Sequence, residues 1–142
     1  MIDEKDKQII DTLLDSGRES SSSISEKLGM SVPTVIDRIK KLQESNVISG
    51  FKAIVNFKSI GLKVSALISI ISESSDNYTE IVKKSLETSE VLKCYATTGS
   101  GSHVLIVNTV DTDSLERLLR KIQSWPGVKR TETQIILSSH KT

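Results

Sequence analysis

Cysteine and aromatic residues are scarce in this chain of 142 residues. The single cysteine, Cys94, cannot form an internal disulfide or a zinc site built on several cysteines, and we expect it to fill space in a strand. Only 4% of the residues are aromatic, so the core must consist mainly of Ile, Val and Leu. The sequence contains no apolar run as long as a membrane span and does not begin with a signal-peptide pattern. We therefore expect a soluble cytoplasmic protein of one ordinary domain or two small ones.

An excess of charge of either sign is also missing. The chain has 19 basic and 18 acidic residues, a net charge of +1. Any affinity for phosphate groups must therefore come from a local arrangement of charges or from several copies of the chain. His103 and His140 have no partner at the spacing of metal ligands, and no Ser/His/Asp or Cys/His set suggests nucleophilic catalysis. We expect no metal, no cofactor and no enzymatic activity.

The most informative stretch runs from Ser31 to Leu42. Val35, Ile39 and Leu42 recur at the spacing of one apolar stripe on a helix. Ser31 is a natural N-cap, and Pro33 lies in the first turn, where a missing N–H costs nothing. The pattern predicts an amphipathic helix with a short, net-positive exposed face, which carries Pro33, Thr34, Asp37, Lys40 and Lys41, with Arg38 at its edge.

Two further helices are expected before this one. The first begins after Asp3, which is followed three positions later by another aspartate, and ends at Gly17. It is rich in acidic residues, so we assign it to the scaffold. Ser23 and Glu26 fit a capping box that opens a short second helix, and Gly29 can take the positive φ that ends it. Two short helices joined by a glycine-containing turn form a helix-turn-helix pattern.

Alternating apolar and polar residues over 51–56 predict a strand, either a small wing or an exit strand. We therefore expect a helix-turn-helix domain with an exit strand over residues 1–56 and a linker over residues 57–62. The second domain is expected over residues 63–142.

The second domain follows the order strand, helix, strand, strand, helix, strand. The expected strands cover residues 63–71, 91–98, 103–110 and 128–137, and the first helix covers residues 78–88. Asp113 with Glu116 reads as a capping box that opens the second helix, which Pro126 and Gly127 end. This order predicts the α+β class and a ferredoxin-like βαββαβ arrangement, in which an antiparallel sheet carries both helices on one face.

Both alternating sets of residues between His103 and Val110 are apolar, although the helices can cover only one face of the sheet. An uncovered apolar face on a monomer marks an association surface. We therefore expect the second domain to dimerise through its sheet. Replacing a sheet residue such as Val107 by a charged residue should dissociate or unfold the assembly.

The residues from Pro33 to Ala53 are similar to a pattern of the Lrp/AsnC (leucine-responsive, or feast/famine) family of prokaryotic transcription regulators. They read PTVIDRIKKLQESNVISGFKA, and the family pattern is P-x-x-V-x-x-R-I-x-x-L-E-x-x-G-V-I-x-G-Y-x-A. Asn46 stands where a glycine is usual. The resemblance covers nearly the full chain. It implies an N-terminal winged helix-turn-helix DNA-binding domain and a C-terminal domain that assembles dimers, often up to octamers, and binds small effectors, usually amino acids.

This resemblance implies that the helix in the stretch from Ser31 to Leu42 enters the major groove of double-stranded DNA. Thr34 and Arg38 would reach base edges, while other polar and basic residues would contact phosphates. A dimer would bind a pseudo-palindromic site. The expected DNA-binding residues are Ser31, Pro33, Thr34, Asp37, Arg38, Lys40, Lys41 and Lys52.

One departure from the family lies at the turn between the second and third expected strands. The family commonly carries T-x-G-D-Y/F-D there, whereas this chain has TTGSGS over residues 97–102. Both carboxylates that could compensate an α-ammonium group are therefore missing. The turn is either free of ligand or offers backbone N–H groups to an anion. The resemblance implies an effector site between subunits at this turn, where ordinary amino acids should bind weakly or not at all. The expected effector-binding residues are Thr98, Gly99, Ser100, Gly101, Ser102 and Thr133.

Two other functions stay open beside a DNA-binding regulator. Siroheme decarboxylases resemble the same two-domain family, but they need a basic, imidazole-containing tetrapyrrole pocket, and one strand histidine is thin support for it. An amino-acid-sensing partner module without DNA binding is compatible with the near-neutral first half of the chain.

Overall fold

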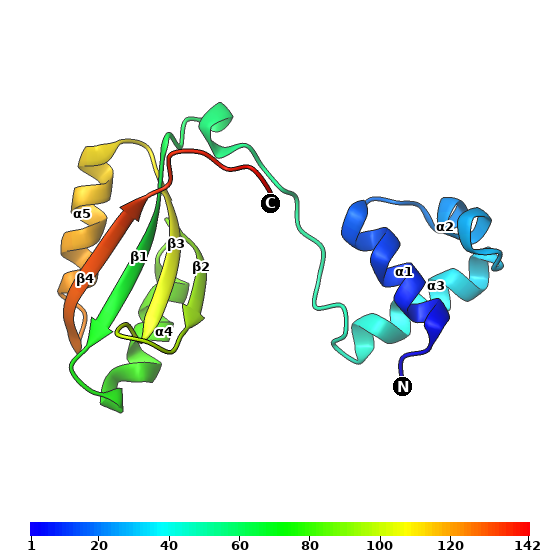
Figure 1. Ribbon diagram of the computed structural model, residues 1–142, viewed down its shortest axis with the longest axis horizontal. Coiled ribbons are helices and arrows are strands. Elements are labelled where there is room, and N and C mark those ends of the chain that lie inside the picture. The colour runs from blue at the N-terminus through cyan, green and yellow to red at the C-terminus, as the bar shows by residue number, and fades with distance from the viewer. The chain divides into compact units, whose positions relative to one another are not determined.

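Three short helices form the beginning of the chain: α1 (Glu4–Asp15), α2 (Ser21–Leu28) and α3 (Val32–Glu44) (Figure 1). Their apolar stripes meet in a small aliphatic core, in which the most buried residues are Ile9, Ile24, Val35 and Leu42. The computed structural model describes residues 1–142 and divides them into two compact units, Met1–Ile54 and Val55–Thr142. No helix in it is both long and apolar enough to cross a membrane.

Capping residues define where α1 and α3 begin, as the sequence predicts. Asp3 and Asp6 form a capping box at the start of α1, in which each side chain accepts from the other residue's backbone N–H. The Ser31 hydroxyl accepts from the backbone N–H of Thr34 at the start of α3. Gly29 ends α2 with a φ of 65°, a conformation in which glycine has no Cβ penalty.

Two other predicted caps are wrong. Ser20 rather than Ser23 caps α2, and the Ser23 hydroxyl instead donates to the Glu19 carboxylate. In the second unit Asp111 rather than Asp113 caps the helix that follows it, by accepting from the backbone N–H of Ser114. Each helix begins earlier than predicted because an equally good capping residue lies two or three positions upstream.

The predicted exit strand over residues 51–56 does not form. Residues 49–56 are in no helix or strand, because no other segment of the chain pairs with their backbone. The side chains of Phe51 and Ile54 are 48% and 75% exposed. An alternating pattern predicts a strand only where a partner strand is available. A short 3₁₀ helix, η1 (Phe57–Ile60), follows this segment.

The second unit confirms the ferredoxin-like prediction. It contains β1 (Val64–Ser72), η2 (Ser75–Asn77), α4 (Tyr78–Glu87), β2 (Val91–Ala96), β3 (His103–Thr109), α5 (Thr112–Gln123) and β4 (Val128–Ile135). The strands form one antiparallel sheet in the order β2-β3-β1-β4. Helices α4 and α5 pack on the same face of this sheet (Figure 1). The core between them is built from the inward side chains of β1 and β3 and from residues such as Ile81 and Leu118 of the helices.

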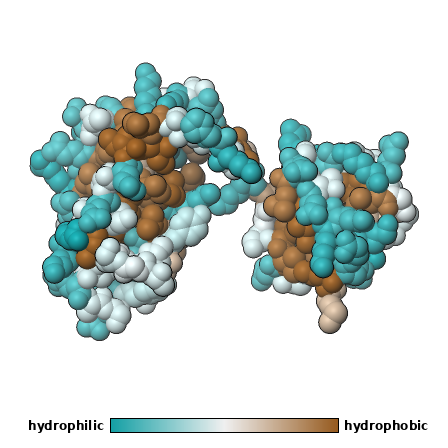
Figure 2. Space-filling model, viewed as in Figure 1, coloured by the Kyte–Doolittle hydropathy of each residue, from teal (hydrophilic) through white to brown (hydrophobic).

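The other face of the sheet carries no helix, and we call it the open face. It includes Leu67, Ile71, Val104 and Ile106, which are half-buried and take no part in the core. Figure 2 shows hydrophobic surface gathered over part of this unit. Val107 is not on the open face, since it is fully buried beneath the helices. Of the two outcomes expected for a charge at Val107, the structure favours unfolding, because the charge would disrupt the core of each chain, so this variant does not test dimerisation through the open face.

The observed cap of α2 leads to a first prediction. Ser20→Ala removes an acceptor from an exposed backbone N–H and should lower the free energy of unfolding of the first unit by about 1 kcal/mol. Ser22→Ala is the matched control, because Ser22 lies inside α2, is exposed and makes no side-chain hydrogen bond. Alanine favours the helix there, so the control should be neutral or slightly stabilising. Urea denaturation followed by circular dichroism measures both, and equal effects would contradict the assigned cap.

Candidate nucleic-acid interface and ligand cavity

The exposed side of α3 gathers most of the residues predicted to contact DNA. Ser31, Pro33, Thr34 and Asp37 are exposed there, and the hydroxyls of Ser31 and Thr34 lie 2.7 Å apart at the start of the helix. Lys40 and Lys41 continue the same surface, whereas Lys52 lies in the loop beyond α3 and makes no ion pair. The helix therefore offers hydroxyl groups at its beginning and ammonium groups in its later turns.

Both lysines of α3 bind carboxylates on the same helix. Lys41 Nζ lies 3.0 Å from Asp37 Oδ2, and Lys40 Nζ lies 4.0 Å from Glu44 Oε1. All four side chains are more than half exposed. Exposed pairs of this kind contribute little to stability. These lysines can therefore exchange their carboxylate partners for phosphate groups at low cost.

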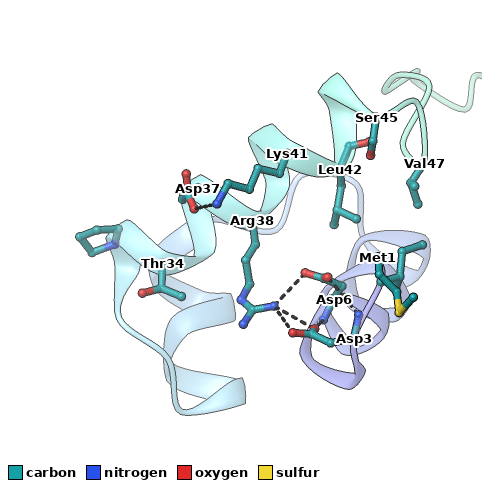
Figure 3. Close-up of a pocket in the computed structure, with 12 residues that line it drawn as sticks. Met1, Asp3, Asp6, Thr34, Asp37, Arg38, Lys41, Leu42, Ser45 and Val47 are labelled. Atoms are coloured by element: carbon teal, nitrogen blue, oxygen red, sulfur yellow. Dashed lines mark hydrogen bonds and ion pairs between the residues drawn. The ribbon is translucent and has the colours of Figure 1, made fainter.

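Arg38 lies in a different environment, in contact with the beginning of α1 (Figure 3). Its Nη1 atom donates to both carboxylate oxygens of Asp3, at 2.8 Å each, and to Oδ1 of Asp6 at 3.0 Å. The hydrogen bond from Arg38 lowers the pKa of the Asp3 carboxyl, and the same two carboxylates raise the pKa of the guanidinium group. The side chain is 29% exposed, in contrast to 72% for each lysine.

Arg38 therefore connects two helices instead of standing free on the exposed face. Its two partners also form the capping box of α1, so the same carboxylates hold the helix start and the guanidinium group. The acidic residues of α1 belong to the scaffold, as the sequence indicates, but the local pattern does not pair them with Arg38. A paired aspartate cap together with an arginine at the edge of an apolar stripe was the signal that could have indicated this contact.

A groove of about 740 Å³ borders this contact. Its walls carry the carboxylates of Asp3, Asp6 and Asp37 together with the cations of Arg38 and Lys41. These charges are already paired across the walls, so the groove does not favour an anion over a cation. No group of three or more His, Cys, Asp or Glu side chains that could hold a metal ion occurs in the structure.

A second cavity, of about 480 Å³, lies at the turn between β2 and β3, and we call it the turn cavity. Five of the six predicted effector residues line it, Thr98, Gly99, Ser100, Gly101 and Ser102. The sixth, Thr133, does not line the cavity. It lies on β4, where it pairs with Ile68 of β1, and β4 is at the opposite edge of the sheet from β2. The cavity is completed by residues that the sequence did not indicate: Ser72, Ser74, Ser75, Tyr78, Ala96, Thr97 and His103.

His103 is the only buried histidine, and its side chain is 1% exposed. Its Nδ1 atom lies 2.7 Å from the hydroxyl of Ser102, which also bonds the hydroxyl of Ser72. The ring of Tyr78 packs against the imidazole at a centroid distance of 4.7 Å. Burial lowers the pKa of His103 below its ordinary value of 6.5, because burial disfavours the charged imidazolium form.

Family models match both units of this chain. Residues 2–49 match a winged helix-turn-helix DNA-binding model, and residues 63–142 match the Lrp/AsnC ligand binding domain. Similar curated proteins include the HTH-type transcriptional regulator FL11 of Pyrococcus abyssi, 36% identical over 99% of this chain and 92% of its own length. The regulatory protein AsnC of Escherichia coli K12 is 30% identical over 98% of this chain and 92% of its own length.

Solved structures of similar proteins extend over the whole chain. Escherichia coli AsnC superposes with a TM-score of 0.85 at 29% identity and covers 100% of this chain and 96% of its own. A feast or famine regulatory protein from Mycobacterium tuberculosis, complexed with L-methionine, superposes with a TM-score of 0.92 at 28% identity and the same coverage.

The Arg38 contact leads to a second prediction. Arg38→Met and Asp6→Asn should each destabilise the first unit, and the double variant should cost clearly less than the sum, because both changes remove the same interaction. Lys41→Met with Asp37→Asn is the matched control pair and should be close to additive, because it breaks an exposed bridge. Denaturation of the four single and two double variants measures both couplings. Additive effects at Arg38 and Asp6 would contradict the contact.

The pH dependence of the same variants gives a third prediction. Since Arg38 lowers the pKa of Asp3 below its ordinary 3.8, its stabilisation is fully present above that pH. It is lost as the pH falls through the lowered pKa and Asp3 becomes protonated. The stability difference between wild type and Arg38→Met should therefore be large at pH 6 and shrink below pH 3.8. A difference that does not change with pH would contradict an ionic contact.

Proposed function

Because this chain belongs to the Lrp/AsnC family of transcription regulators, we propose that it binds operator DNA through α3 and responds to a small molecule in the turn cavity. The resemblance found in the sequence is thereby confirmed. The chain combines a helix-turn-helix DNA-binding domain with an Lrp/AsnC ligand-binding domain, and its curated relatives are named as transcriptional regulators. We infer from these relatives that it is not an enzyme and that it works where the DNA lies, in the cytoplasm.

The observation that carries the DNA-binding proposal is the exposed polar face of α3. In this proposal Thr34, which is exposed at the start of α3, reaches a base edge in the major groove, and Ser31, Lys40, Lys41 and the more distant Lys52 contact phosphates. Pro33 and Asp37 lie on the same side of α3. Pro33 is uncharged and Asp37 is negative, so we assign neither of them a phosphate contact. The weak bridges of the lysines support this proposal, because phosphate groups can replace their carboxylate partners.

We assign Arg38 a positioning role instead of the base contact that the sequence suggested. Its Nη1 atom is held by two carboxylates, so drawing the guanidinium group away from α1 toward a base would break several charge-assisted hydrogen bonds. By holding α3 against the start of α1, Arg38 sets the angle at which Thr34 meets the groove. This role affects recognition without a direct contact.

The open face of the sheet supports a dimer. Leu67 and Ile106 face each other across β1 and β3, and Val104 and Tyr95 continue the apolar surface onto β2. A second copy of the chain can cover this face with the same residues, as two-fold symmetry requires. A dimer also doubles the lysines available to DNA, which a chain of net charge +1 needs for useful affinity. Its two α3 helices would occupy half-sites about 34 Å apart on a pseudo-palindrome.

The fourth prediction concerns DNA binding. Lys41→Ala should weaken binding to all sequences alike and reduce the slope of log K against log salt by about 1, since one phosphate contact is lost. Thr34→Val should cost about 1 kcal/mol on the preferred site only, because it removes a base contact. Arg38→Met should weaken preferred binding without changing the salt slope. Fluorescence anisotropy with selected operator DNA at several salt concentrations measures these effects.

The control for this series is Lys83→Ala, an exposed lysine of α4 in the second unit. It should leave both affinity and salt slope unchanged. If Lys41→Ala and Thr34→Val bind DNA as the wild type does, α3 is not the reading helix. If Arg38→Met lowers the salt slope by about 1, Arg38 contacts a phosphate and the positioning role is wrong.

The fifth prediction concerns the dimer. Ile106→Asp places a charge on the open face and should dissociate the dimer into folded monomers, because the charge would be buried without a partner in the interface. Leu86→Asp is the matched control, since Leu86 is 79% exposed on α4 and away from the open face. Light scattering with circular dichroism distinguishes dissociation from unfolding. If the wild type is monomeric at micromolar concentration, the proposed dimer is wrong.

A further inference from the structure

One buried polar atom in this chain has no hydrogen-bond partner, the Nε2 atom of His103. The other nitrogen of the ring, Nδ1, forms a hydrogen bond with the hydroxyl of Ser102. A buried polar atom without a partner raises the free energy of the folded state, so such an atom needs a specific explanation. His103 is among the residues that line the turn cavity, although its Nε2 atom is closed off from solvent.

The turn cavity has the size and lining of a site for a small polar molecule. Its volume of about 480 Å³ lies in the lower part of the range of about 300–1,000 Å³ for such sites. Serine and threonine hydroxyls from two segments of the chain, residues 72–75 and 97–102, line it, and each can donate or accept a hydrogen bond. The backbone N–H groups of residues 98–101 donate to no backbone carbonyl of the chain, so the turn can offer them to an acceptor.

The charges around the cavity favour one sign of ligand. No Asp, Glu, Lys or Arg lines it. The only ionisable residues in the lining are His103 of β3 and Tyr78 of α4. The strands beside His103 present Ile70 and Ala96 to it, and the nearby Glu73 lies outside the lining. An ammonium group would find no carboxylate to compensate its charge. An anion would find an imidazole that can become a cation and backbone N–H groups that can donate.

We propose that the turn cavity binds a small carboxylate or phosphate anion that carries no ammonium group, with His103 taking up a proton from solvent as the anion binds. In the empty cavity the imidazole is neutral and carries one proton. In the occupied cavity both ring nitrogens carry a proton, and the imidazolium turns so that its Nε2–H, which is buried in the structure described here, donates to the anion. This inference rests on the proposed function, since it gives the chemical class of the effector.

The affinity should therefore depend on pH. Burial holds the pKa of His103 below 6.5 in the empty cavity, so the imidazole is neutral at pH 7. A bound anion favours the imidazolium and raises this pKa. Above the pKa of the empty protein, binding then takes up one proton, and the affinity falls as the pH rises, by up to about tenfold per pH unit.

Titration calorimetry on the full chain tests the class of ligand with matched pairs. Pyruvate is compared with L-alanine and 2-oxoglutarate with L-glutamate, because each pair shares a carbon skeleton and differs in the ammonium group. Inorganic phosphate distinguishes a phosphate ligand from a carboxylate. We expect at least one anion to bind tenfold or more tightly than either amino acid at pH 6.5, and its affinity to fall between pH 6.5 and 8. An amino acid that binds as tightly as its 2-oxo counterpart would overturn the proposal.

His103→Gln tests the proton, because glutamine keeps a hydrogen-bonding side chain that does not titrate in this range. The variant should bind the anion more weakly and without pH dependence, whereas the control His140→Gln, in the exposed C-terminal segment, should behave as the wild type. If His103→Gln does not fold, calorimetry of the wild type in buffers of different ionisation enthalpy measures the proton uptake directly. With the carboxylate probes, which do not titrate in this range, no proton uptake, or a pH dependence that survives in His103→Gln, would refute the role of His103.

Anisotropy with operator DNA on the same preparations separates this inference from the proposed function. If the chain binds its operator but none of the probes, the anion site is wrong and the regulator stands. If the chain binds no operator, the proposed function fails, whatever the probes do.

Discussion

The contact of Arg38 with Asp3 and Asp6 holds the DNA-binding unit in its shape. A small aliphatic core holds α1, α2 and α3 together. The guanidinium group bonds carboxylates that are themselves bound to the backbone at the start of α1, so its position is defined by both helices. The position of α3 against α1 therefore depends on this polar contact as well as on the apolar core.

The division of labour among the basic residues of α3 follows from their surroundings. Arg38 has several donors in a planar group and can satisfy two carboxylates at once, whereas each lysine offers a point charge on a flexible stem. The lysines bind a carboxylate one turn away and remain well exposed. A helix of modest net charge can therefore keep one cation for its own structure and present the others to a partner.

The second unit combines an uncovered apolar face with a cavity in one sheet. Helices α4 and α5 cover one face, and the other face, on which we propose that a second copy packs, carries apolar side chains without a helix. The turn between β2 and β3 extends beyond the paired strands, where serine and glycine have replaced the charged and aromatic residues typical of the family. This substitution removes the carboxylates that suit an ammonium group and leaves a buried imidazole as the only cation that the cavity can form.

The sequence by itself determined the elements whose signals are local. The apolar stripes of α1 and α3, the caps at Asp3 and Ser31, the turn at Gly29 and the order of the second unit follow from the spacing of neighbouring residues. Only the tertiary structure decided the partner of Arg38, which lies 32 and 35 positions from Asp6 and Asp3 in sequence, and the face on which Val107 lies. It also decided that residues 51–56 form no strand within one chain, and that His103 is buried beside a cavity without a partner for Nε2. These features depend on contacts between segments that are far apart in sequence, and a local pattern of residues carries no information about such contacts.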